Sequence, residues 1–385
     1  MAGRESGRGA AFGRPMNSPK IDSDAAPGRD VGWGVTLWGA RAVDQALRDP
    51  VLRVAGRDIW HDDPRVQDLV DRMPSMHDDP ARRRALIQVR ALMSPDASRA
   101  AAAMMRVQMR DLARDAVTSE GPEVDLVDRF TSLIAPTFLR QHLGLSEILS
   151  ALALRSFSVA LGAELVNRGK PDPQRVASIL AVSEALRAFA ALLRSQPLDE
   201  HPLSDLVAHV PDDRDVAAVI ALLASGGQET VSSLTCSVIL ALSDEHSTAC
   251  TWETDPVSVV DDLAGRRPPI TMLARVAAEA TQADGVAIDQ GRIVMLQLDR
   301  EAAEAGLAFG MGLHRCLGRN FARMVIPIAV NELRAVWPCW PPEDLHAEGG
   351  GTVPVFRGPA RMFARSADPA TPMRQDMPVS EEQGG

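Results

Sequence analysis

The sequence contains no tyrosine and few other aromatic residues, and this scarcity already narrows its possible functions. Of its 385 residues, only six are Trp and nine are Phe. A surface that stacks nucleic-acid bases needs exposed aromatic rings, and a general nucleic-acid binder needs an excess of basic residues. The chain instead carries 41 Lys and Arg against 51 Asp and Glu, a formal net charge of -10. We therefore expect no nucleic-acid partner.

Cysteine is equally scarce, with four residues at Cys236, Cys250, Cys316 and Cys339. This is too few for a disulfide framework, and none has the C-x-x-C spacing of a metal or redox motif. The histidines show no metal-ligand spacing either, so the sequence predicts no zinc site. No G-x-S-x-G, Walker or dinucleotide-binding fingerprint occurs. A reducing, cytoplasmic setting is the expectation.

Membrane attachment is not expected from the distribution of apolar residues. The N-terminal arginines are followed by no apolar stretch, which a secretory signal would need. The longest apolar segment, Val216–Leu242, contains Ser225, two glycines, Gln228 and Glu229 at its middle. Because a charge at the centre of a membrane span is costly, the pattern predicts a buried helix with a polar interruption.

Helical periodicity dominates the rest of the chain, and strand signals are few and short. The pattern predicts a mainly α-helical domain over residues 33–365 with a small β region, and disordered tails at Met1–Gly32 and Ser366–Gly385. The predicted helices are Arg41–Leu47, Pro80–Leu92, Ser98–Val117, Val124–Leu143, Glu147–Val166, Pro173–Ser195, Asp215–Leu242 and Leu317–Val336, the last kinked or unwound at Pro327. The predicted strands are Gly34–Trp38, Val286–Ile288, Ile293–Leu298 and Val353–Phe356.

The most informative segment is the glycine-rich loop Phe309-Gly-Met-Gly-Leu-His-Arg-Cys-Leu-Gly. Gly310, Gly312 and Gly318 permit tight backbone turns where a flat or bulky group approaches. Cys316 stands just before a helical pattern, whose free N–H groups and dipole would stabilise a thiolate. Such a thiolate suits nucleophilic attack or metal ligation, and a buried free cysteine is the third possibility.

The spacing Phe-Gly-x-Gly-x-His-x-Cys-x-Gly, with Ala-Arg downstream, resembles the haem-thiolate signature of the cytochrome P450 family at every usual fixed position. The resemblance implies that Cys316 is the axial thiolate ligand of the iron in haem b. It also implies that Phe309 packs near the thiolate and that His314 contacts a haem propionate. Gly310 and Gly318 would shape the loop around the cofactor.

A second motif, Gly226-Gly227-Gln228-Glu229-Thr230, lies about 85 residues before the cysteine. Paired glycines inside a helix cost roughly 1 kcal/mol each relative to Ala, so close approach of a cofactor is one explanation and a simple kink is another. An acid followed by a hydroxyl can relay protons. The segment resembles the distal-helix motif of the family. By that resemblance Glu229 and Thr230 deliver protons during oxygen activation, and the glycines make room for O2 and substrate.

Several arginines match positions of the family that meet the cofactor or an electron donor. Arg275 follows a Pro-Pro turn, where the family carries a propionate-binding arginine; a surface arginine on a strand is the alternative. Arg82 stands near the position of a family histidine and would supply a cation there. Arg315, Arg319 and Arg323 beside the cysteine would steer an acidic electron donor, or else form a solvated helix face.

The chain also departs from the family pattern. Asp262 and Gly265 replace the Glu and Arg of a Glu-x-x-Arg pair, and only Arg300–Ala308 stands where the family has a long meander. Because stranding one member of a buried charge network costs about 3–5 kcal/mol, the network is expected to have been lost as a unit. Asp262 would pair instead with Arg266, one turn later. These features indicate a trimmed, divergent member.

The resemblance covers roughly Gly34 to Arg365 and implies the triangular, mainly helical fold of the family. The expected function is a soluble, cytoplasmic haem monooxygenase of bacterial type. It would insert one oxygen atom of O2 into a small organic molecule, with electrons from a ferredoxin and its NAD(P)H-dependent reductase. The high Ala, Arg and Gly content suggests an actinobacterial source and specialised metabolism. Trp60–His77 and Ser156–Asn167 would contribute to the substrate pocket.

Two other functions fit parts of the sequence. The lost Glu-x-x-Arg pair would suit a catalytically silent relative that activates a partner enzyme, although the complete cysteine loop opposes this. Alternatively, the protein binds haem but uses peroxide directly, or rearranges its substrate without a redox partner.

Overall fold

The computed structural model describes residues 28–30, 34–54, 61–77, 80–118, 121, 123–166, 170–196, 201–337, 339–350 and 355–365. The tails predicted at Met1–Gly32 and Ser366–Gly385 lie outside these residues, except at one place. Gly28–Asp30 forms a strand, β1, paired antiparallel with β2 (Gly34–Leu37). The predicted N-terminal tail therefore extends too far into the chain, because three of its residues complete a sheet edge.

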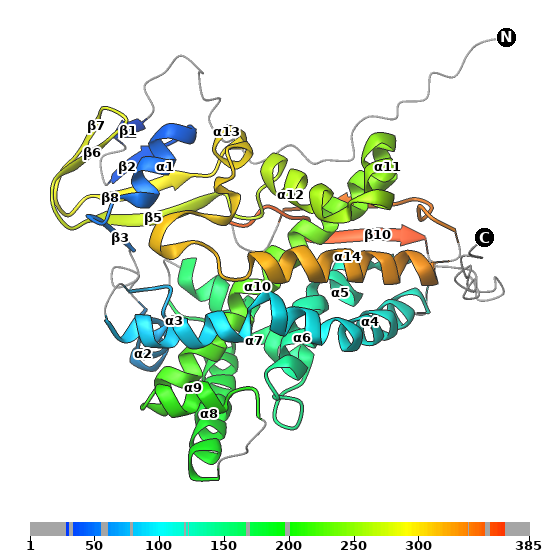
Figure 1. Ribbon diagram of the computed structural model, residues 1–385, viewed down its shortest axis with the longest axis horizontal. Helices are drawn as coiled ribbons and strands as arrows, with labels where there is room; N and C mark the ends of the chain where they lie inside the picture. Colours follow the sequence, from blue (N-terminus) through cyan, green and yellow to red (C-terminus); the bar gives the residue numbers. More distant parts are fainter. Residues whose placement is uncertain are drawn as a thin grey trace, which may run out of the picture.

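Helices form most of the described chain, in a triangular outline with the strands along the upper side of the view (Figure 1). The mainly α-helical fold is as predicted. The helices are α1 (Ala40–Arg48), α2 (Pro64–Arg72), α3 (Pro80–Leu92), α4 (Pro95–Val117), α5 (Leu126–Arg129), α6 (Ile134–His142), α7 (Ala151–Val166), α8 (Pro173–Ser195), α9 (Ser204–His209), α10 (Asp213–Asp244), α11 (His246–Thr254), α12 (Pro256–Arg266), α13 (Arg300–Glu304) and α14 (Arg319–Val336). Short 3-10 turns occur at Thr131–Leu133, Leu307–Phe309 and Gly312–His314.

Most predicted helices are present, and two have the predicted bounds, but Val124–Leu143 is wrong as a single helix. Its start is a strand, β4 (Glu123–Asp125), followed by α5, a 3-10 turn and α6. The Asp125 carboxylate accepts hydrogen bonds from the N–H groups of Val127 and Asp128, which caps a new helix there. Local capping by an acidic side chain competes with a continuous helix. Pro327, in contrast, lies inside α14 without ending it.

The β region is larger than predicted. Its main sheet has five strands in the order β1-β2-β8-β5-β3, with β2 and β8 parallel and the other pairs antiparallel. A second sheet has the order β4-β10-β9, and β6 and β7 form a hairpin. The bounds are β3 (Leu52–Val54), β5 (Met272–Ala277), β6 (Thr281–Ala283), β7 (Val286–Ile288), β8 (Ile293–Gln297), β9 (His346–Glu348) and β10 (Arg361–Arg365). Of the predicted strand Val353–Phe356, 353 and 354 lie outside the described residues, and Phe356 forms an isolated bridge with Ile270.

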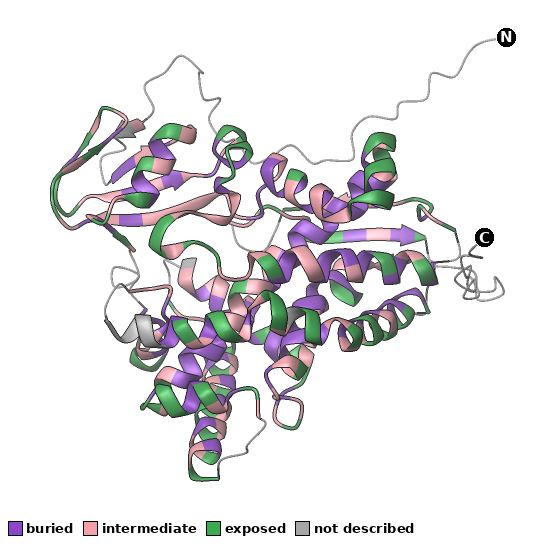
Figure 2. Cartoon of the chain, in the orientation of Figure 1, coloured by how far each residue is buried: buried purple, intermediate pink, exposed green. Residues whose placement is uncertain are grey.

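The core is built around α10. Its residues 231–242 are buried except for Ser237, and the helix packs against α6, α7, α8, α12 and α14. A second, smaller core lies between α1 and the five-stranded sheet. The outer faces of α4, α8 and α9 are exposed (Figure 2). The two cores meet where the loop before α14 passes between the sheet and the helices (Figure 1), which is the place where the sequence predicts a site.

One helix has the length and composition of a membrane span, and it is not the predicted apolar segment. The helix is α8, which has 23 residues with a mean hydropathy of 1.8 over its most apolar window. It packs against α7 and α10 through buried side chains that include Val176, Ile179, Val182 and Leu186. Core helices meet the same test of length and composition.

The region around α12 and α13 explains how the chain does without the Glu-x-x-Arg pair. As predicted, Asp262 pairs with Arg266, with 2.8 Å between Oδ2 and Nε, and Arg266 also contacts Glu245. At Gly265 a Cβ atom would lie 3.5 Å from the carbonyl oxygen of Ala303. Helix α13 therefore packs directly on α12, over the position where the family carries an arginine side chain.

This packing predicts opposite effects for two substitutions of Gly265. Gly265→Ala makes only ordinary van der Waals contacts and should raise the free energy of unfolding by up to about 1 kcal/mol through helix propensity. Gly265→Arg forces α12 and α13 apart and should lower it by about 1–3 kcal/mol. Urea unfolding of the two variants beside the wild type measures both. Equal stability of the Arg and Ala variants would contradict the packing.

Candidate active site

A cavity of about 310 Å³ lies between α10 and the loop that precedes α14. Eight of the eleven predicted site residues line it, although they come from two segments far apart in the sequence. From α10 they are Gly226, Gly227 and Thr230; from the loop they are Phe309, Gly310, His314, Cys316 and Gly318. Of the remaining three, Glu229 and Arg275 do not line it, and the side chain of Arg82 lies outside the described residues.

Cys316 is held by its backbone and faces the cavity. Its N–H donates to the carbonyl oxygen of Phe309 at 2.9 Å, which closes the loop just before α14 begins. Burial raises the pKa of the Cys316 thiol, and hydrogen bonds from the N–H groups of Gly318 and Arg319 oppose that rise without cancelling it. The predicted stabilisation of a thiolate by the N-terminus of α14 is therefore present, but desolvation has the larger effect on the pKa. A cation bound in the cavity would supply the missing charge for a thiolate.

The loop can adopt this shape only because of its glycines. Gly312 has φ 71°, a backbone conformation that other residues rarely adopt. A Cβ atom there would lie 2.6 Å from the carbonyl oxygen of Leu47 in α1. The loop is thus seated on α1 through backbone contact, and this contact fixes where Cys316 stands.

The paired glycines of α10 have no packing reason within the protein. A Cβ atom at Gly226 would meet only Leu222 Cδ1, at 4.0 Å, and one at Gly227 only Ala135 Cβ, at 3.8 Å. The helix is also continuous through them, from Asp213 to Asp244. Because two helical glycines cost roughly 1 kcal/mol each, the room they leave on the cavity side fits a group bound there. The donor set of a thiolate, His314 and this open helix face suits haem.

Thr230 and Glu229 point to different surroundings, because successive residues of a helix are turned by about 100°. The Thr230 hydroxyl, at the cavity, donates to the carbonyl oxygen of Gly226 at 3.0 Å. Glu229 is partly buried on another side. Burial raises the pKa of the Glu229 carboxyl, and the charge of Arg155 on α7 opposes the rise. The proton relay through both residues stays a prediction. In that relay Glu229 would act through Thr230, because Glu229 does not line the cavity.

Of the two predicted propionate contacts outside the loop, Arg275 does not line the cavity. Arg275 on β5 is 7% exposed and donates to the carbonyl oxygen of Ala274 at 2.8 Å, so its alternative as a surface arginine is wrong. Arg82 lies in the first turns of α3, and its side chain lies outside the described residues. Leu86, one turn later, does line the cavity.

The arginines beside the cysteine are partly neutralised by a residue that the sequence analysis missed. Asp261 lies 3.6 Å from Arg319 and 3.2 Å from Arg323, measured between charged atoms. The Arg319 guanidinium also lies over the Phe309 ring, 5.5 Å from its centroid. Arg315 is exposed. The surface beside the cysteine is therefore less positive than the sequence suggests. In the sequence, the only sign of this pairing was the two adjacent acids, Asp261 and Asp262.

Opposite this loop, the segment 61–77 supplies Pro74 and Ser75 to the cavity, as predicted for part of Trp60–His77. Trp60 lies outside the described residues, and no described residue of the other predicted segment, Ser156–Asn167, lines the cavity. The segment Ser156–Asn167 has a different role, because its Glu164, on α7, binds His61 and so anchors the segment 61–77.

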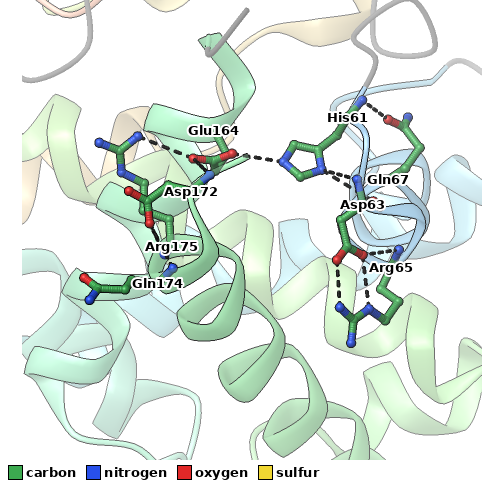
Figure 3. Close-up of polar contacts among 8 residues, drawn as sticks. All are labelled: His61, Asp63, Arg65, Gln67, Glu164, Asp172, Gln174 and Arg175. Carbon is green, nitrogen blue, oxygen red and sulfur yellow. Dashed lines mark hydrogen bonds and ion pairs between the residues drawn. The ribbon is translucent and has the colours of Figure 1, made fainter. Parts of the chain in front are cut away.

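The anchor is a buried contact between His61 and Glu164 (Figure 3). His61 Nε2 lies 3.1 Å from Glu164 Oε2, and the Glu164 side chain has no exposed surface. The Asp63 N–H donates to His61 Nδ1 at 3.1 Å, so Nε2 is the ring nitrogen that faces the carboxylate. Glu164 Oε1 accepts from the Asp172 N–H and from Arg175, both at 3.4 Å. No sequence pattern pointed to this cluster.

Comparison with known proteins shows which fold the chain shares. No protein-family model matches the chain. Erythromycin C-12 hydroxylase of Saccharopolyspora erythraea is 27% identical over 264 residues, 59% of this chain and 64% of the hydroxylase. Cytochrome P450-SOY of Streptomyces griseus is 27% identical over 247 residues, 58% of each protein. The chain thus covers less than two thirds of the length of these curated relatives.

Solved structures match over more of the chain. Epothilone D-bound cytochrome P450epoK has a TM-score of 0.74 at 20% identity and covers 89% of this chain and 94% of its own. P450BioI in complex with an acyl carrier protein has a TM-score of 0.73 at 20% identity, covering 87% and 92%. The chain has the fold of the cytochromes P450, and the curated relatives that it matches include cytochromes P450. A cysteine thiolate ligates the haem iron in cytochromes P450, so a haem site would account for both Cys316 and the glycines of α10.

The raised pKa of Glu229 predicts how stability responds to pH. A carboxyl whose pKa is higher in the folded protein stabilises the fold below its ordinary pKa and loses that contribution as pH rises. Glu229→Gln should therefore be more stable than the wild type at pH 8, where the buried charge is unfavourable, and the difference should shrink at pH 5. Urea unfolding at both pH values measures this. A difference that is the same at both would contradict the assignment.

Loss of the His61 side chain should loosen the segment 61–77. His61→Ala leaves the buried Glu164 carboxylate without its closest donor, and we expect the free energy of unfolding to fall by about 1–3 kcal/mol. His61→Gln, whose amide can donate in its place, should recover part of the loss. Arg65→Ala is the control in the same segment, since Arg65 is exposed and pairs only with Asp63; little change is expected there. Urea unfolding compares the variants, and equal losses for His61→Ala and Arg65→Ala would argue against the anchor.

Proposed function

We propose that the protein is a haem-thiolate monooxygenase that inserts one oxygen atom of O2 into a small organic molecule. The observation that carries this proposal is that one cavity is lined by Cys316 on one side and by Gly226, Gly227 and Thr230 on another. A thiolate in the same cavity as two helical glycines that leave space beside them suits a flat cofactor with room for O2 and substrate next to it.

Each residue has a role that its surroundings support. Haem, ligated by Cys316, would supply the activation of O2. His314 from the loop, with Arg275 and Arg82, would bind the propionates. Thr230 carries a hydroxyl at the cavity that can pass a proton, because it is held by Gly226 and can exchange that hydrogen bond. Glu229 sits one residue away as a carboxyl whose raised pKa favours holding a proton.

Electrons would come from a ferredoxin and its NAD(P)H-dependent reductase in the cytoplasm. An acidic ferredoxin would meet the exposed Arg315 beside the cysteine loop. The curated relatives support a role in specialised metabolism, since one is an erythromycin hydroxylase. The shape of the site is equally compatible with turnover by peroxide, and dependence of turnover on ferredoxin separates that variant.

The proposal is tested by the absorption spectrum of haem-supplemented protein, reduced and exposed to carbon monoxide. We expect a strongly red-shifted Soret band in the wild type, and its complete loss in Cys316→Ala because the thiolate ligand is gone. Cys250→Ser, which changes an exposed cysteine on α11, is the matched control and should keep the band.

Two outcomes would overturn the proposal. Absence of haem uptake by the folded wild type would exclude it and turn attention to an accessory protein that acts on a partner enzyme. A Soret band at the position of a neutral thiol or histidine ligand would mean that haem binds without the thiolate.

A further inference from the structure

Helix α12 contacts the chain on both sides of the cysteine loop, residues 309–318 (Figure 1). Before the loop, α13 packs over Gly265, where a Cβ atom would lie 3.5 Å from the carbonyl oxygen of Ala303. After the loop, Asp261 faces the first turns of α14. Because Asp261 and Gly265 are four residues apart, they lie on one face of α12. One face of a single helix thus borders both ends of the segment that carries Cys316.

The contact with α14 is one carboxylate shared by two guanidinium groups. Asp261 Oδ2 lies 3.6 Å from Arg319 Nη2 and 3.2 Å from Arg323 Nη2. The two arginines are one turn apart, so their charges would repel each other without the acid. Each of the three side chains is about a third exposed, but Asp261 Oδ1 and both Nε atoms are buried. The partial shielding from solvent makes these pairs less sensitive to salt than fully exposed ones.

Arg319 connects this ion pair to the cysteine loop. Its guanidinium lies over the Phe309 ring, 5.5 Å from the centroid, and its backbone N–H donates to the Cys316 sulfur. The Phe309 carbonyl oxygen in turn accepts from the Cys316 N–H at 2.9 Å. Both residues of the hydrogen bond that closes the loop are therefore in contact with the arginine that Asp261 holds.

We propose that Asp261 is a positioning residue for the sulfur of Cys316 and acts through Arg319, by holding the start of α14 and the closed loop against α12. The adjacent acid has a different partner, because Asp262 pairs with Arg266 on its own helix. The charge of Asp261 alone would have the opposite effect, since a negative charge nearby disfavours a thiolate. Position and charge thus predict opposite results when the acid is neutralised. The proposal rests on the proposed function only for the group that the sulfur ligates.

The first measurement is amide hydrogen exchange of the full, haem-free chain, read by mass spectrometry on peptides that span residues 305–323. Asp261→Asn removes the charge and keeps the size of the side chain. Residue 261 lies outside these peptides, so their intrinsic exchange rates stay the same. We expect their exchange to be about fivefold faster, because weaker ion pairs make local opening easier. Peptides from α8, which packs on α7 and α10, should exchange as in the wild type.

The second measurement is the spectrum of reduced, haem-loaded protein with carbon monoxide. In Asp261→Asn we expect the band of a neutral thiol ligand to replace part of the red-shifted Soret band, because the sulfur is held less firmly. Asp261→Glu, which keeps a carboxylate, should recover most of the red-shifted band and of the slow exchange. Arg319→Gln should reproduce the changes of Asp261→Asn, and the variant with both substitutions should add little to either, because the two residues act together.

Asp262→Asn is the matched control. It removes the same charge from the next residue of the same helix and breaks the pair with Arg266 instead. It should leave the exchange of residues 305–323 and the red-shifted band unchanged. If Asp261→Asn unfolds as a whole, exchange rises in α8 as well, and Arg319→Gln decides the question because it breaks the same contact from the other side.

Three results would overturn the proposal. One is unchanged exchange of residues 305–323 in both Asp261→Asn and Arg319→Gln, and another is an equal effect of Asp262→Asn. The third is a red-shifted band that keeps or gains intensity in Asp261→Asn, which would assign the carboxylate a role through charge alone. Failure of the wild type to take up haem would contradict the proposed function alone, because hydrogen exchange is measured on the haem-free chain.

Discussion

The position of one sulfur atom, in the same cavity as the paired glycines of α10, is the constraint on which the other features of the site depend. Cys316 is set by a backbone hydrogen bond to Phe309, and its loop is seated on α1 at Gly312. Burial raises the pKa of its thiol despite two favourable N–H groups. The raised pKa favours a neutral thiol, and a positively charged group bound in the cavity would favour the thiolate instead.

Support for that loop has been reorganised around two neighbouring acids. Asp262 turns to Arg266 on its own helix, whereas Asp261 reaches Arg319 and Arg323 on α14. Helix α13 closes over Gly265 in the space that a longer connection and an arginine would need. Among the described residues both acids thus have an arginine partner, so neither is left without a counter-charge. The cysteine loop is held without the meander of other family members.

The features that the sequence predicted are those encoded over short distances. The cysteine loop, the motif of α10 and the bounds of α3 and α8 depend on residues within a few turns of one another. The misassigned helix at Val124–Leu143 failed because one capping side chain, Asp125, outweighed the apolar pattern. The His61–Glu164 contact joins residues 103 positions apart. A lone histidine and a lone glutamate carry no local sign of such a pairing.

The two walls of the cavity are fixed by different kinds of contact. Backbone contacts hold the wall with Cys316, and side-chain contacts hold the wall with Ser75, so the two walls are expected to respond differently to substitution. The wall with Cys316 is fixed by backbone contacts, at Gly312 and Phe309, and a side chain at Gly312 would clash with the carbonyl oxygen of Leu47 and displace the loop. The wall with Ser75 is fixed by side chains, at His61 and at Arg72, which binds Asp215 on α10, and single substitutions can change it while α10 and the cysteine loop stay as they are. A substitution on the side of Ser75 is therefore expected to change the shape of the cavity while Cys316 keeps its position, because the two walls are held by separate contacts.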